Sequence, residues 1–171
     1  MVIDARVFAR TAGALSGHLA AASCWRLCQG LPAQQPGVFD WQLMGRADGG
    51  RGASAQLWLD VLATGHVRVV CQRCLAEFDL ELRVSDRLGL VDDAAQLEAM
   101  DALETKGQGS DVEYLVAESA LDVESLIEDE LILVLPVAPR HEVCPGGAGA
   151  FHDQEGAPAS PFAVLAQLKK H

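Results

Sequence analysis

The side chains with the most specific chemistry in this sequence are two cysteines three positions apart, Cys71 and Cys74. A Cys-x-x-Cys pair on a tight turn brings two sulfurs to one side, so that both can bind one zinc ion. The same spacing is also typical of a redox dithiol that cycles between thiol and disulfide. The spacing alone leaves both chemistries open, and the flanking structure has to decide between them.

The residues around the cysteine pair predict a β-hairpin with the pair at its tip. Residues 78–84 are apolar at every second position, which is the period of a half-buried strand, and residues 67–70 read as the incoming strand. A redox dithiol needs its first cysteine at a helix N-terminus, where the helix dipole lowers the thiol pKa. Because the chain continues as a strand, the hairpin favours a metal over redox chemistry.

Two further potential ligands, His141 and Cys144, occur much later in the chain. Together with Cys71 and Cys74 they make a Cys3His set, which suits a structural zinc ion held by four protein ligands. Such a site needs all four ligands to be present. Without an ion, the same residues are reduced thiols at a hairpin tip, and this alternative stays open.

The charge of the chain is concentrated in one segment. There are 13 Lys and Arg residues against 24 Asp and Glu, and residues 86–130 alone contain 14 of the acids and two of the basic residues. An acidic surface attracts a basic partner, and the acids expected to contact it are Glu124, Glu128 and Glu130. Alternatively, the segment only keeps the protein soluble.

Direct contact with RNA would need basic residues elsewhere, because an acidic surface repels a phosphate backbone. On the cysteine hairpin these are Arg68, Arg73 and Arg83, and two lysines, Lys169 and Lys170, lie near the C-terminus. They are few and interleaved with acids, so a protein partner is favoured over RNA.

Length and composition predict a single domain over residues 1–171, half of them apolar. Five cysteines without framework spacing argue against a secreted disulfide scaffold. The charged residues of the first ten positions do not fit a signal peptide, and the longest apolar run, residues 131–138, is too short to span a membrane. We therefore expect a cytoplasmic protein with no membrane segment.

The first third of the chain predicts strands joined by turns. Residues 1–8, 38–44 and 55–63 read as strands, with a turn at Thr64-Gly65 into the cysteine hairpin, and short turns imply an antiparallel meander. Residues 11–31 read as a helix with Cys24 and Cys28 on one face. Three tryptophans are expected in the core, although they could also form a stacking platform for bases: Trp25, Trp41 and Trp58.

The remainder of the chain predicts helices that cover the sheet. Residues 92–103 and 122–135 read as helices, the second capped by Asp122 and ended by Pro136, with a short strand at 112–116 between them. Residues 143–161 are predicted to be a mobile loop, and 162–170 a short C-terminal helix that docks through its apolar side. The expected fold class is α+β: an antiparallel sheet or meander with a Cys-x-x-Cys hairpin, packed against a few helices.

Three segments resemble the bacterial YceD family, which is named for large ribosomal RNA subunit accumulation. They are VCQRCLAEFDLEL, DVESLIEDELILVLPVAPRHEVC and the terminal PFAVLAQLKK, in the same order and with a variable acidic region between the first two. Some relatives carry a second cysteine pair after the Leu-Pro segment, which implies a zinc site completed by Cys71 and Cys74. Here His141 and Cys144 stand in its place.

The resemblance implies a role in the synthesis, processing or stability of large-subunit ribosomal RNA. We expect a non-enzymatic ribosome biogenesis factor that binds a basic ribosomal or assembly protein, large-subunit ribosomal RNA or both, with no small-molecule substrate. No His, Ser or Lys complements the clustered carboxylates of residues 122–135, which argues against catalysis there. The alternatives are a thiol-disulfide oxidoreductase that uses Cys71 and Cys74, or a zinc-stabilised binding module of another pathway.

Overall fold

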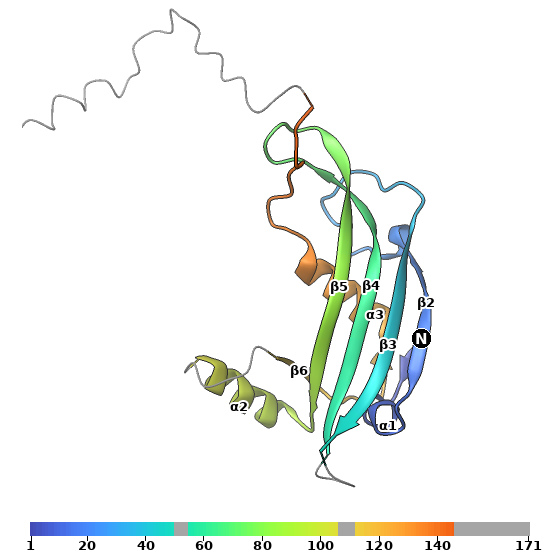
Figure 1. Ribbon diagram of the computed structural model, residues 1–171, viewed down its shortest axis with the longest axis vertical. Helices are drawn as coiled ribbons and strands as arrows, with labels where there is room; N and C mark the ends of the chain where they lie inside the picture. Colours follow the sequence, from blue (N-terminus) through green and yellow to red (C-terminus); the bar gives the residue numbers. More distant parts are fainter. Residues whose placement is uncertain (50–54, 106–111, 146–171) are drawn as a thin grey trace, which may run out of the picture.

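The computed structural model describes residues 1–49, 55–105 and 112–145 and has an α+β fold, as the sequence predicts (Figure 1). Residues 146–171, and with them most of the predicted loop and the predicted C-terminal helix, lie outside the described residues. The main sheet has five strands in the order β2-β3-β4-β5-β6. These strands are β2 (Ala14–Ala20), β3 (Val38–Asp48), β4 (Gln56–Val70), β5 (Glu77–Val91) and β6 (Glu113–Val116).

Strands β2 to β5 form the expected antiparallel meander, and only β6 adds in parallel to β5. The predicted turn at Thr64-Gly65 is wrong, because β4 runs straight through it and pairs Gly65 with Leu82. A glycine is required there, since a Cβ atom would lie 2.9 Å from the carbonyl oxygen of Val38. The hairpin arms are therefore 15 residues each, and the cysteine tip lies at their far end.

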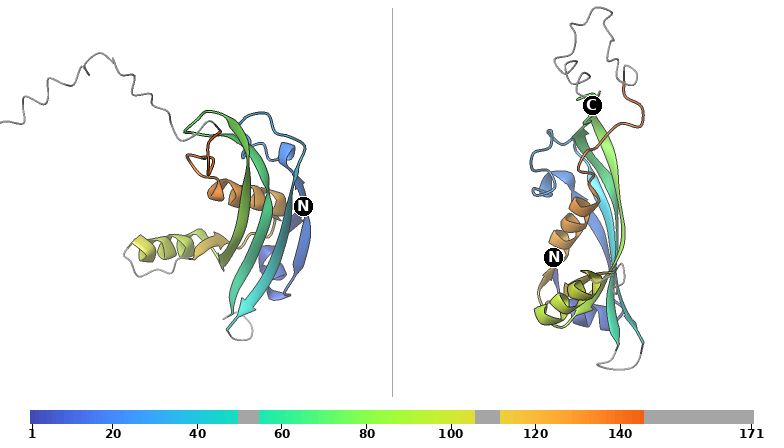
Figure 2. Two further views of the ribbon diagram at one scale, coloured as in Figure 1. Left: turned by 45° about the horizontal axis from the view of Figure 1, so that its top comes forward. Right: turned by 90° about the vertical axis from the view of Figure 1, so that its left-hand side faces the viewer.

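One face of the sheet carries the core. Helices α1 (Ala5–Arg10), α2 (Ala94–Thr105) and α3 (Val123–Val134) all lie on this side, and α3 runs across the centre (Figure 2). Alternate strand residues such as Phe39, Leu43 and Leu59 are fully buried and belong to the same core cluster as Ile127 and Leu131 of α3. Within the described ranges no helix covers the opposite face, which carries most of the charged residues of β3, β4 and β5, such as Asp40, Asp60 and Arg83.

Helix α3 begins as predicted from its capping residues. The Asp122 carboxylate accepts a hydrogen bond from the backbone N–H of Glu124 at 3.1 Å, while Leu121 and Leu126 on either side of the cap are both buried. Residues just before the helix also form the short strand β7 (Leu121–Asp122), which pairs with β1 (Val2–Ile3). The start of the chain is thus fastened to the start of α3.

The N-terminal predictions need correction. Residues 11–31 are not a helix: they form β2, a single 3-10 turn η1 (Ala21–Ser23) and further turns. Pairing with β3 overrides helix propensity, and Gly17 leaves room for the Trp41 ring, which a Cβ would approach to 2.7 Å. The predicted strand at 1–8 is likewise limited to β1, because Asp4 caps α1 by accepting from Val7 N–H.

The three tryptophans do not share one environment. Trp41 is buried in the core and Trp58 is half-buried, but Trp25 is 69% exposed, so the core expectation is wrong for Trp25. Trp58 belongs to β4 and Trp41 to β3, whereas Trp25 lies in the turns after η1. The three rings therefore do not make a common stacking platform.

Candidate metal centre

The tip of the β4–β5 hairpin positions the first two cysteines. The Cys71 carbonyl accepts from Leu75 N–H and the Cys71 N–H donates to the Ala76 carbonyl, both at 2.9 Å, which closes a tight turn. Leu75 has φ of +61°, a left-handed conformation that is uncommon for a residue with a Cβ. The turn places Cys71 in the interior and leaves Cys74 half-buried on the same side.

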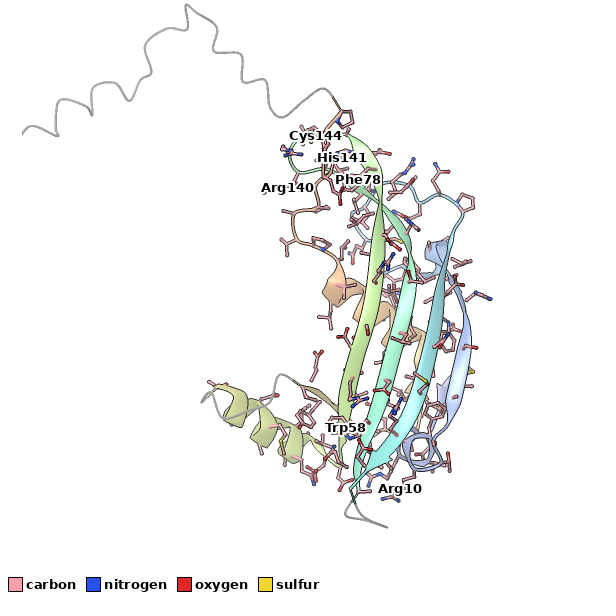
Figure 3. The ribbon with its side chains drawn as sticks, viewed as in Figure 1. Arg10, Trp58, Phe78, Arg140, His141 and Cys144 are labelled. Atoms are coloured by element: carbon pink, nitrogen blue, oxygen red, sulfur yellow. The ribbon has the colours of Figure 1, made fainter. Side chains whose placement is uncertain are left out.

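The segment after α3 brings the other two ligands to this tip (Figure 3). It is attached to the hairpin by a hydrogen bond of 2.8 Å from Gln72 N–H to the Pro139 carbonyl. The His141 ring packs on Phe78 of β5, with ring centroids 4.2 Å apart and planes inclined by 32°. Cys144, three residues later, is buried.

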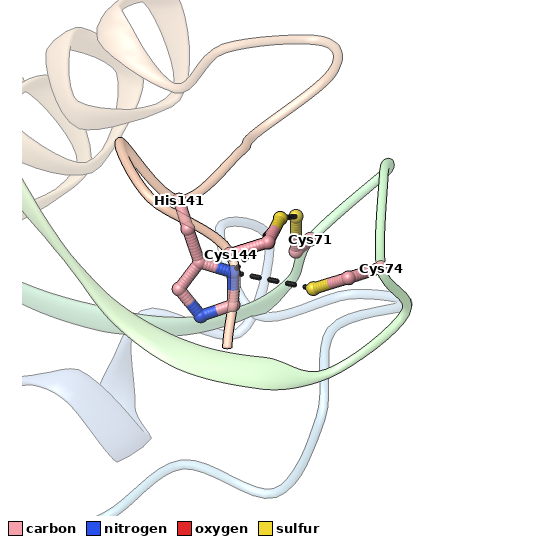
Figure 4. Close-up of side chains that lie close together, drawn as sticks. All are labelled: Cys71, Cys74, His141 and Cys144. Atoms are coloured by element: carbon pink, nitrogen blue, oxygen red, sulfur yellow. Dashed lines mark hydrogen bonds between the residues drawn. The ribbon is translucent and has the colours of Figure 1, made fainter. Parts of the chain in front are cut away.

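The four predicted ligands converge in one cluster (Figure 4). Their ligand atoms all lie within 4.8 Å of one another. The Sγ atoms of Cys71 and Cys144 are 3.7 Å apart, and the Nδ1 atom of His141 lies 3.4 Å from Cys74 Sγ and 4.0 Å from Cys144 Sγ. A tetrahedral zinc site with bonds of about 2.3 Å requires ligand separations of about 3.8 Å. The cluster therefore could hold a metal ion, and its cysteines are free thiols.

Arg73, between the two hairpin cysteines, supplies positive charge to the cluster. Its Nε donates to Cys144 Sγ at 3.0 Å and its Nη2 donates to the His141 carbonyl at 3.1 Å. The pKa of this guanidinium is raised, chiefly by its hydrogen bond to Cys144. Three thiolates around one divalent ion leave a net negative charge, so a cation here suits such a site.

The sulfurs at the tip differ in their tendency to ionise. Burial opposes ionisation of Cys71, but hydrogen bonds from the backbone at His141, Cys74 and Arg73 lower its pKa to about 5. The pKa of Cys74 is raised: the Ala76 backbone favours its thiolate, but burial and the neighbouring sulfurs outweigh that effect. A preformed thiolate is the state that binds a metal, and it is also the state of a redox nucleophile.

Comparison with protein families identifies the chain. The family model described as "Large ribosomal RNA subunit accumulation protein YceD" matches residues 59–169. The chain belongs to the YceD family. The match covers both halves of the Cys3His cluster as well as the whole of β5 and α3. Searches of curated proteins and of solved structures found no match.

Among the described residues of this YceD-family chain, no helix is long and apolar enough to cross a membrane.

The three arginines expected to contact RNA are not gathered into a basic patch. Arg73 belongs to the metal cluster. Arg68 donates to Asp79 at 3.0 Å, and Arg83, with a 75% exposed side chain, pairs with Glu81 at 2.7 Å. Each is therefore offset by a neighbouring acid or sulfur.

The acids expected to face a partner are mostly not on the surface. Glu124 is exposed, whereas Glu128 and Glu130 are buried, so the three acids do not form one exposed patch on α3, and their contact with a partner stays a prediction. Glu128 accepts hydrogen bonds from the backbone N–H groups of Arg26 at 2.8 Å and Leu27 at 3.1 Å. The Arg26 guanidinium pairs with the same carboxylate at 3.0 Å. Glu128 thus anchors the turns after β2 to α3, a role that no local sequence pattern signals.

Cys24 and Cys28 lie in these anchored turns, not on a helix face. Burial, followed by the nearby charge of Glu128, raises the pKa of Cys24 to about 12. Both thiols donate to backbone carbonyls, at 3.6 Å to Ala20 and 3.2 Å to Ala21. They behave as structural thiols separate from the metal cluster.

Glu130, the third of the α3 acids expected to face a partner, gives a prediction for how the stability of the fold depends on pH. Burial, followed by the charges of Glu113, Asp86 and Asp129, raises its pKa from 4.5 to about 7. Because the folded chain binds this proton more tightly than the unfolded chain, the stability it contributes is complete below pH 4.5 and is lost as pH rises through 7. We expect Glu130→Gln to stabilise the protein by about 2 kcal/mol at pH 8 and hardly at all at pH 4.5.

Urea unfolding at the two pH values measures this difference. The exposed Glu98 on α2 is the control, and Glu98→Gln should leave the pH dependence unchanged. An equal effect of Glu130→Gln at both pH values would contradict the explanation by ionisation.

Proposed function

We propose that the chain is a non-enzymatic ribosome biogenesis factor, which supports the synthesis, processing or accumulation of large-subunit ribosomal RNA. The observation that carries this proposal is the YceD family match over residues 59–169, because the family is described by that role. Among the described residues, the charged groups that pair with acids of α3 are the N-terminal ammonium and Arg26, and neither forms a catalytic pair with a carboxylate, which supports a binding role over catalysis. We place this role in the cytoplasm, where ribosomes are assembled.

In this proposal the Cys3His cluster binds a structural zinc ion. Cys71 and Cys74 offer two sulfurs from the hairpin turn, while His141 and Cys144 offer a nitrogen and a sulfur from the segment after α3. Bound zinc supplies a cross-link between these segments. Arg73 offsets the thiolate charge and orients the second segment through its bond to the His141 carbonyl.

The partner in this proposal is a basic ribosomal or assembly protein, large-subunit ribosomal RNA, or both. The net charge of −11 favours the protein, because RNA affinity comes largely from Lys and Arg. Glu124 remains a candidate contact for a basic protein, and the exposed Arg83 for RNA. No small-molecule substrate is needed for either mode.

Ribosomal RNA profiles of a deletion strain test the proposed function. Deletion should lower mature large-subunit RNA relative to small-subunit RNA, with precursors accumulating. The wild-type gene and Cys28→Ser should restore the ratio, whereas Cys74→Ser should not, because only Cys74 belongs to the cluster. An unchanged ratio in the deletion strain would remove the proposed function and leave a zinc-stabilised module of another pathway.

A thiol-disulfide oxidoreductase is the second candidate, favoured by the lowered pKa of Cys71 and the 3.7 Å separation of its sulfur from that of Cys144. Against it, Cys71 is fully buried and directly follows strand β4, whereas reactive cysteines are partly exposed. This candidate predicts turnover of a thiol substrate that Cys71→Ser abolishes. The biogenesis factor predicts no turnover by the zinc-loaded protein.

A further inference from the structure

Among the described residues, the outer edge of β5 has no strand paired with it along most of its length. Strand β5 pairs with β4 from Glu77 to Leu90, but its pairing with β6 covers only Leu88–Val91. Within the part of the chain that the structure describes, no strand lies beside residues 79–87 on the side away from β4 (Figure 1). A strand edge of this kind presents backbone N–H and C=O groups that can pair with another chain.

Three carboxylates from separate elements meet beside this edge: Asp86 on β5, Glu113 at the start of β6 and Glu130 on α3. Glu113 pairs with Leu88 of β5, and Asp86 lies two residues before Leu88 on the same face, which is the face that α3 contacts. In agreement with this placement, burial and then the charges of Glu113 and Asp86 raise the pKa of Glu130. Glu130 is only 4% exposed, yet among the described residues none donates a hydrogen bond or pairs as a cation with it. A buried carboxylate without a partner is costly, and a cation supplied from outside would offset that cost.

Apolar side chains complete the surface on the helix side of the edge. Leu80 of β5 is half-buried, and Leu133, one helical turn after Glu130 on α3, is 63% exposed. A strand added at this edge would place every second side chain on the same side as Leu80. The surface therefore suits a segment in which apolar and basic residues are interspersed.

We propose that residues 79–87 of β5 bind an extended segment of a basic partner protein as an added strand, with a Lys or Arg of that segment pairing with Asp86, Glu113 and Glu130. The choice of a basic protein rests on the proposed function, and the edge and its acids specify the mode of binding. Strand addition gives affinity through the main chain, and the side chains give selectivity.

Charge distinguishes a basic partner protein from the other chains or segments that could pair with this edge. A second copy of the chain would bring the same acids against one another. Residues 146–171 contain two lysines and two acids, so their net charge is zero and offers no excess of positive charge to the acids. A basic segment of another protein is the occupant that complements the edge.

Synthetic nine-residue peptides test the proposal on the full-length protein. A peptide that carries both Val and Lys at its alternate positions, Val to face Leu80 and Lys to face Asp86, with Thr between them, should bind and shift the backbone amide NMR signals of residues 79–87. A Glu–Val peptide should not bind, and a Lys–Val peptide N-methylated at every second residue should bind at least about tenfold more weakly, because it cannot pair as a strand. The double variant Asp86→Asn/Glu113→Gln should lose about tenfold in affinity, whereas the matched Glu98→Gln/Asp101→Asn on α2 should lose none.

Three results would overturn the proposal. The N-methylated peptide could bind as well as the parent peptide, or the shifts could lie on another element. Hydrogen exchange could also show that the edge amides of residues 79–87 are already protected in the free protein. Protection that rises with protein concentration would indicate that a second copy of the chain pairs with the edge. Protection that does not depend on concentration would indicate that a segment of the same chain pairs with it. None of these results depends on ribosomal RNA profiles, so the strand-addition mode and the proposed function can fail separately.

Discussion

Replacing Cys71 by serine is expected to abolish stoichiometric zinc binding. The wild-type protein should contain one zinc ion per chain, and the variant should bind zinc at least about 100-fold more weakly. Mutating a residue that only hydrogen-bonds to a metal ligand already lowers metal affinity by about 10–100-fold, and Cys71 is itself a ligand in this proposal. Cys71 is the buried member of the hairpin pair and lies 3.7 Å from Cys144, so the hydroxyl of serine cannot replace its thiolate. Metal analysis and competition with a chelator measure the effect.

The control for this experiment is Cys28→Ser. Cys28 is a free thiol outside the cluster whose sulfur donates to the Ala21 carbonyl, so serine should retain full zinc content. Equal zinc content in wild type and Cys71→Ser, or wild-type protein purified from zinc-replete cells without any zinc, would disprove the metal site.

Glu128→Ala is expected to destabilise the fold by about 3 kcal/mol. The substitution leaves the N–H groups of Arg26 and Leu27 without their acceptor and removes the buried end of an ion pair. The turns after β2 should loosen, since this carboxylate holds them against α3. Urea denaturation gives the free energy of unfolding, and hydrogen exchange should show loss of protection at Arg26 and Leu27.

Glu98→Ala on the exposed side of α2 provides the comparison, with an expected change below about 0.5 kcal/mol. If Glu128→Ala were as mild as this control, Glu128 would be a surface acid available to a partner, contrary to its position in the structure.

The parts of the fold that sequence reasoning predicted are those determined by local periodicity. The alternation in residues 78–84 identified β5, and Asp122 with Leu121 and Leu126 identified the start of α3, because capping and strand period are properties of neighbouring residues. The Cys3His cluster was also predictable, since few residue types bind zinc.

The parts that were missed depend on contacts between distant segments. Residues 14–20 read as helical by composition, but become β2 through pairing with β3 and the fit of Trp41 over Gly17. Likewise Glu128 looked like one acid among many, because its partners at Arg26 and Leu27 lie about a hundred positions away. Pairing and burial of this kind leave no periodic trace in the sequence.

A zinc ion bound by Cys74 and His141, as proposed above, would close a long loop in the chain. Residues 75–140 between them include β5, α2, β6, β7 and α3, and hence the whole acidic segment, residues 86–130. By analogy with a disulfide of similar span, tying the ends of about 70 residues together lowers the entropy of the unfolded chain by the equivalent of about 4 kcal/mol. If zinc binds as proposed, removing the ion would therefore lower the stability of the folded protein, and the supply of metal in the cell would set how much of the chain is folded.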